Sequence, residues 1–156
     1  MSRTTPRSYY YLFVTPNLYD YLEMPSDIRR GFNASVSAYQ LTDIMWGFYK
    51  RIDRSKLSQW RNKDSFKKDL GKREPFYLTI QSVATAYKHL YTEGSYEVPS
   101  PGPARIIVPK EDTELESQQG DVIMRRRNGS EFSLTAALTA VVEKLWPDVL
   151  PTEDGS

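Results

Sequence analysis

His89 is the only histidine in the chain, and imidazole is the side chain best suited to acid–base chemistry near neutral pH. Lys88 precedes it, and Asp43 comes close to it if the two long helices that carry these residues pack antiparallel. A carboxylate there would hold one tautomer of the ring and raise its basicity. The alternative is a buried Asp43–His89 hydrogen bond that fixes helix register. His89, Asp43 and Lys88 are therefore the catalytic candidates if the protein is an enzyme.

Several other kinds of chemistry are excluded by composition. The chain has no cysteine, so it has no disulfides, thiolate metal sites, iron–sulfur clusters or cysteine nucleophiles. A single histidine excludes a multi-histidine metal site, and no phosphate-binding glycine loop, dinucleotide fingerprint or nucleophile elbow occurs. We therefore expect no metal and no cofactor.

Residues 50–73 form the most basic segment, with ten Lys and Arg against three Asp, a local charge of +7 in a chain of net charge +1. An exposed indole at Trp60 would stack on a base while the cations meet phosphates. A second basic group, residues 125–127, falls on a predicted hairpin. The candidate nucleic-acid-binding residues are Lys50, Arg51, Arg54, Lys56, Trp60, Arg61, Lys63, Lys67, Lys68, Lys72, Arg73, Arg125, Arg126 and Arg127. The alternative is a solvated connector with Trp60 packed beneath it as an anchor.

Two further clusters each have two interpretations. The acidic residues 111–121 either bind a cation or screen the basic segment, or they form a plain solvated loop, and their spacing does not match an EF-hand. The aromatic cluster of residues 9–13 either covers the helices or forms part of an interface, and the expected protein partner is another protein or a second copy of the chain. Both uses of the aromatic cluster predict that truncating residues 1–14 does harm.

The elements that must position these residues are mostly helices, because apolar residues recur at spacings of three and four. Thr15 with Pro16 is typical of a helix start, Gly71 of a helix end, and Ser133 of an N-cap. Gly31 and Gly47 inside the longest segment indicate close packing against a neighbour. The predicted helices are residues 15–24, 26–53, 64–70, 75–93 and 134–146, the last ending at Trp146-Pro147.

A small β insertion is expected before the last helix. Four prolines in residues 98–109 indicate a linker, and residues 105–108 have the pattern of a short strand. Residues 122–127 and 130–134 flank Asn128-Gly129, which is the strongest short hairpin signal because both turn positions need positive φ.

Together these elements predict a mainly α fold, a helical bundle with a small β-hairpin or three-stranded insertion before the last helix. We expect one domain over residues 1–156, with a two-long-helix core at 26–92, the linker and β insertion at 98–133 and a closing helix at 134–146. The apolar run near the N-terminus is too short for a signal peptide or a membrane span, so we expect a cytoplasmic protein with no membrane contact.

Two helical motifs carry a resemblance. Residues 38–46 have the pattern A-x-x-L-x-D-x-x-W, and residues 84–89 the pattern A-x-A-x-K-H. With the basic connection between them, they resemble small uncharacterised bacterial and phage helical proteins that are in turn similar to the HEPN-like superfamily. The active members of that superfamily are ribonucleases of toxin–antitoxin and antiphage defence systems. The resemblance covers residues 26–92 and implies a bundle, a tendency to dimerise and a defence-related setting.

The sequence departs from that superfamily at its catalytic motif, which is an Arg followed after four to six residues by His. The corresponding positions before His89 are Ser82, Val83 and Ala84. We therefore expect a non-catalytic helical module that binds a macromolecular partner, either protein or nucleic acid. The alternative is a metal-independent HEPN-like ribonuclease that uses His89 and Asp43 with one or more of Lys88, Arg51 and Arg54.

Overall fold

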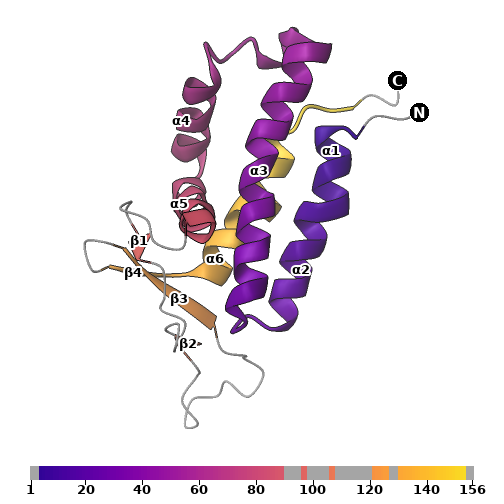
Figure 1. Ribbon diagram of the computed structural model, residues 1–156. Helices are drawn as coiled ribbons and strands as arrows, with labels where there is room; N and C mark the ends of the chain where they lie inside the picture. Colours follow the sequence, from indigo (N-terminus) through magenta and orange to yellow (C-terminus); the bar gives the residue numbers. More distant parts are fainter. Residues whose placement is uncertain (1–3, 90–95, 98–105, 108–120, 127–129, 154–156) are drawn as a thin grey trace.

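The computed structural model describes residues 4–89, 96–97, 106–107, 121–126 and 130–153. Within these ranges the fold is mainly helical with a small antiparallel sheet before the last helix, so the predicted fold class is confirmed. Figure 1 shows the longest helix, α3, at the centre, with α1 and α2 along one side and α4 and α5 along the other. The helices on these two sides are α1 (Pro6–Tyr9), α2 (Thr15–Glu23), α3 (Ile28–Ile52), α4 (Lys63–Arg73) and α5 (Phe76–His89).

Helix α3 begins and ends close to the predicted limits. Asp27 caps its N-terminus, where the carboxylate accepts hydrogen bonds from the amides of Arg29 and Arg30. The buried side of α3 is rich in small residues, including Ala34, Ser35, Ser37 and Ala38, which let neighbouring helices approach closely. Ser35 and Ser37 donate their hydroxyls to α3 carbonyls, so burying them leaves no unsatisfied oxygen.

The prediction of close packing is confirmed at Gly31 and wrong at Gly47. A Cβ added at Gly31 would lie 2.6 Å from Cδ2 of Leu134 and 3.2 Å from Cε1 of Tyr21. Apart from the nearby backbone of α3 itself, no atom of the described residues lies within 4 Å of a Cβ added at Gly47.

The N-cap of the first helical segment is Thr5, ten residues before the predicted cap at Thr15. Thr5 and Ser8 form a capping box, and α1, the π-helix segment η1 (Tyr10–Val14) and α2 follow without a break. Thr15 is helical (φ −68°, ψ −42°), so the assignment of Thr15 as an N-cap is wrong. In η1 the Thr15 amide donates a hydrogen bond to the Tyr10 carbonyl, so the turn is wider than in an α-helix. This wide turn lets the helix continue through Pro16.

Helix α5 packs antiparallel on α3, and two hydrogen bonds set the register. The hydroxyls of Thr42 and Tyr77 are 2.7 Å apart in the core, and Gln81 donates from Nε2 to the hydroxyl of Tyr39 over 3.1 Å. Burial raises the pKa of Tyr77, because the phenolate would lose its hydration.

The closing helix begins as predicted, with the Ser133 hydroxyl accepting from the Ala136 amide. It runs through α6 (Leu134–Thr139), η3 (Ala140–Leu145) and α7 (Trp146–Val149), so the predicted end at Trp146-Pro147 is wrong. A π segment again precedes the proline. Trp146 is fully buried and donates its indole N–H to the Ala38 carbonyl over 3.0 Å, which joins the closing helix to α3.

The sheet is organised around β3 (Asp121–Arg126). Strand β4 (Glu131–Ser133) pairs antiparallel with β3, which confirms the predicted hairpin, although its turn, Asn128-Gly129, lies outside the described residues. The short strands β1 (Tyr96–Glu97) and β2 (Ile106–Ile107) also pair antiparallel with β3, and β2 falls inside the predicted strand 105–108. The Val122 amide donates to the Pro25 carbonyl, so the sheet is joined to the turn between α2 and α3.

Helix α4 is longer than predicted because Gly71 does not end it. Asn62 caps its N-terminus by accepting from the Ser65 amide, and the helix continues to Arg73. Gly71 is buried inside α4, where a Cβ would lie 2.9 Å from Cγ of Leu78 on α5. Gly71 therefore allows α4 to pack closely against α5, and it does not end the helix.

The aromatic cluster near the N-terminus divides between core and surface. Tyr10 is buried and donates its hydroxyl to the Val142 carbonyl over 2.7 Å, and burial raises the pKa of Tyr10 to about 12. Tyr11, Leu12 and Phe13 are each at least half exposed. Part of the cluster thus covers the bundle, and an interface at its exposed part stays a prediction. Among the helices that the structure describes, none has the length and apolar character needed to cross a membrane.

Candidate functional site

A pocket of about 770 Å³ lies where the C-terminal part of α3 faces the connection to α4. The connection contains the 3₁₀ helix η2 (Arg54–Leu57), whose start is held by Asp53. The Asp53 carboxylate accepts hydrogen bonds from the amide and the hydroxyl of Ser55. The bond from the hydroxyl is the main reason that the pKa of Asp53 is lowered. The pocket is lined by Trp46, Lys50, Arg54, Leu57, Ser58, Trp60, Arg61, Asn62, Lys63 and Asp64.

The apolar wall of the pocket is built on Phe66, a fully buried residue of α4. Its ring centroid lies 5.7 Å from that of Trp46, with an interplanar angle of 26°, and 4.5 Å from that of Trp60. Trp60 also donates its indole N–H to Asp69 over 2.9 Å, and this hydrogen bond is the main reason that the pKa of Asp69 is lowered. The wall is therefore anchored to α4 by both packing and a hydrogen bond.

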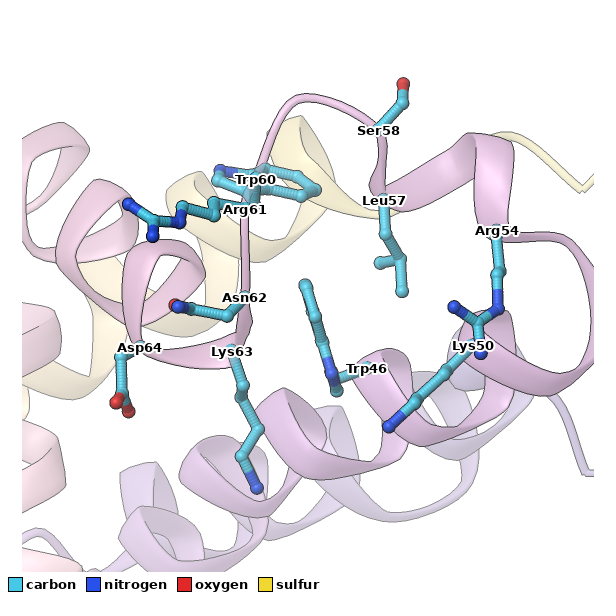
Figure 2. Close-up of a pocket in the computed structure, with 10 residues that line it drawn as sticks. All are labelled: Trp46, Lys50, Arg54, Leu57, Ser58, Trp60, Arg61, Asn62, Lys63 and Asp64. Atoms are coloured by element: carbon cyan, nitrogen blue, oxygen red, sulfur yellow. The ribbon is translucent and has the colours of Figure 1, made fainter.

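Four of the predicted nucleic-acid-binding cations line this pocket: Lys50, Arg54, Arg61 and Lys63. Lys63 forms an ion pair with Asp43 of α3 over 3.1 Å. Lys50, Arg54 and Arg61 are exposed and have no carboxylate partner within 4 Å among the described residues. Figure 2 shows Arg54 and Leu57 pointing from η2 into the space above α3, whereas Arg61 points toward the α4 side.

The other basic residues of the segment are placed elsewhere. Lys67 lies over the ring of Tyr39, and Arg73 pairs with Asp69 at 3.0 Å and with Asp148 at 3.7 Å. These contacts join α4 to α3 and to the closing helix. Arg51, Lys56, Lys68 and Lys72 are exposed and do not line the pocket.

The prediction of an exposed Trp60 indole is wrong, and the alternative of a packed anchor is correct. Only 8% of Trp60 is exposed, because the ring lies against Phe66 with its N–H directed to Asp69. The neighbouring charges suggested that Trp60 is exposed. Burial of the apolar ring is favourable because its N–H keeps a hydrogen bond, so the ring is buried. The indole with exposed surface in this region is Trp46, which sequence reasoning did not select as a binding residue. The sequence feature that could have identified Trp46 is its spacing of four from Lys50, because residues four apart lie on one face of a helix.

The predicted pairing of Asp43 with His89 is also wrong. Thr42 contacts Tyr77, so Asp43 lies beside the start of α5. His89 is the last residue of α5, twelve residues or about 18 Å farther along the helix axis. Asp43 is 60% exposed and pairs with Lys63 instead.

Several predicted site residues lie outside the described residues. These are the side chains of Lys88, His89, Arg125 and Arg126, all of Arg127, and residues 111–120 of the acidic segment. In the ranges that the structure describes, no group of three or more His, Asp or Glu side chains is placed to hold a metal ion.

Comparisons of this chain with protein-family models, with curated proteins and with solved structures find no match. The HEPN-like resemblance stays a prediction that rests on the two helical motifs.

Proposed function

We propose that this protein binds nucleic acid through the basic pocket, and that single-stranded RNA is its partner. The observation that carries the proposal is that Lys50, Arg54 and Arg61 all line one pocket and have no carboxylate partner among the described residues. Phosphates that meet such cations release condensed counterions, which is the main source of sequence-independent affinity for nucleic acids.

The charge arrangement supports an anionic polymer over a neutral partner. Lys63 has its carboxylate partner Asp43, and Arg73 has Asp69, so the protein neutralises some cations of this segment internally. Lys50, Arg54 and Arg61 are not neutralised in this way within the described ranges, where Asp64 is the one carboxylate in the pocket lining. The pocket therefore attracts phosphate groups.

The test is a pair of triple substitutions within the same basic segment. Lys50→Glu/Arg54→Glu/Arg61→Glu removes three of the four pocket cations and leaves Lys63. Lys56→Glu/Lys68→Glu/Lys72→Glu makes the same charge change at exposed residues outside the pocket. Fluorescence anisotropy of a labelled single-stranded RNA is measured at several salt concentrations. We expect the pocket variant to lose at least ten times more affinity than the control. The log–log salt slope of the wild-type protein should be about −2, the value for three phosphate contacts on a single strand.

Equal losses in the two triple variants, or no binding by the wild-type protein at low salt, would overturn the proposal. The recovered RNA is run on a gel. Cleavage that His89→Ala abolishes would favour the HEPN-like ribonuclease over a non-catalytic module.

A further inference from the structure

Trp46 differs from the other two tryptophans of the chain in what its ring contacts. Trp60 and Trp146 are buried and donate their indole N–H groups to Asp69 and to the Ala38 carbonyl. Trp46 is only partly buried, and within the described ranges its indole N–H has no acceptor. Buried indoles normally find such a partner. Trp46 instead lines the pocket, where part of its side chain is exposed.

One face of the Trp46 ring is stacked, and the residue also lines the pocket. Phe66 stacks on the α4 side of the ring. Figure 2 shows Leu57, Arg54 and Lys50 on the opposite side, with Leu57 pointing toward the ring. The space on this side is thus bordered by an aromatic face, an aliphatic side chain and two cations.

We propose that this space takes one unpaired nucleotide, with its base on the face of Trp46 opposite Phe66 and its phosphate between Lys50 and Arg54. The inference rests on the proposed function and adds to it the form of the nucleic acid. Every base has a π-face, so a stacking platform beside cations recognises single strands with little dependence on sequence.

The same geometry disfavours a duplex. Bases inside a duplex are stacked on both faces and would have to leave the helix to reach Trp46, at a cost in unstacking and unpairing. A duplex would therefore meet only the cations of the pocket. An acidic peptide would also use the cations alone, and its affinity would not depend on an aromatic ring at position 46.

The first test changes the ligand and leaves the protein intact. Binding of a short oligouridylate is compared with binding of an abasic ribose–phosphate chain of the same length and charge. We expect the abasic chain to bind about ten-fold more weakly, within the range measured for loss of one stacked base. Equal affinities for the two chains would overturn the inference. The proposed function would still stand if both chains lost affinity in the pocket triple variant.

The second test uses Trp46→Leu, with Trp46→Phe as a variant that keeps a ring and Tyr19→Leu as a control for loss of an exposed aromatic residue on α2. Trp46→Leu should lose about ten-fold in affinity for oligouridylate and none for the abasic chain or an RNA duplex. Trp46→Phe should recover most of the loss. A uniform loss across all three ligands would overturn the inference, and melting temperatures separate a loss of fold from a loss of stacking.

Discussion

At the scale of single residues, hydrogen-bonding groups decide the roles of the aromatic side chains. Trp60 lies in the most basic segment of the chain, yet its ring is buried because Asp69 accepts its N–H and Phe66 covers it. Asp69 also pairs with Arg73, so one carboxylate joins the pocket wall to the last turn of α4.

Asp69→Asn should lower the free energy of unfolding by about 1 kcal/mol at neutral pH, since the carboxylate is only partly exposed and accepts two hydrogen bonds. The folded-state pKa of Asp69 is lowered, so its contribution is present above the ordinary Asp pKa of about 3.9 and is lost as the pH falls through the folded-state value. The stability difference between wild type and variant should therefore shrink on acidification.

Urea unfolding at neutral and acidic pH measures this difference. Asp20→Asn is the control, because Asp20 is exposed on α2 and its carboxylate has no partner in the described part of the chain. A difference that stays constant with pH would contradict the role assigned to Asp69.

At the scale of elements, the glycines of α3 show how a helix interior depends on its neighbours. Gly31 and Gly47 look alike in the sequence, since both interrupt the same amphipathic helix. Only Gly31 lies where α2 and α6 meet α3, and a side chain there would enter the space of Leu134 and Tyr21.

Gly31→Ala should destabilise the protein by about 1–3 kcal/mol through overpacking, because Leu134 and Tyr21 are fully buried and have little room to move. Gly47→Ala should stabilise it by about 0.5–1 kcal/mol, because alanine lowers the entropy cost of a helix interior and its Cβ meets no neighbouring element in the part of the chain that the structure describes. Thermal unfolding followed by circular dichroism measures both changes. Shifts of the same sign would contradict the packing described for Gly31.

At the scale of the whole molecule, the first helical segment joins the two ends of the described chain. Arg7 donates to the carbonyls of Leu150 and Pro151, and its amide donates to Glu153. Tyr10 and Val14 enter the core from the same segment, with Tyr10 bonded to the closing helix. This segment is therefore part of the bundle and not an appendage.

Deletion of residues 1–14 should abolish cooperative unfolding, because it removes two core side chains and the contacts of Arg7 from a fold whose net stability is expected to be about 5–15 kcal/mol. Circular dichroism melting is the measurement. The double substitution Leu12→Ser/Phe13→Ser is the control, since both side chains are at least half exposed and should change stability by less than about 0.5 kcal/mol each. A cooperative transition in the deletion variant would show that α3, α5 and the closing helix suffice.

The amino-acid sequence by itself determined the elements whose signals are local. The cap at Ser133 and the hairpin around Asn128-Gly129 depend on residues within a few positions of one another, and each predicted element is present. The errors at Thr15 and Pro147 have one cause, because a π turn lets a helix pass a proline that usually starts or ends one.

Only the tertiary structure decided which distant residues meet. The register of α5 on α3, set by the Thr42–Tyr77 and Tyr39–Gln81 contacts, separates His89 from Asp43, and helical periodicity alone carries no information about that register. The same packing buries Trp60, leaves Trp46 partly exposed in the pocket lining and places Lys50, Arg54 and Arg61 in that lining. A basic segment becomes a candidate binding site only when folding places its charges on one surface, because affinity for a polyanion depends on the distances between cations in space and not along the chain.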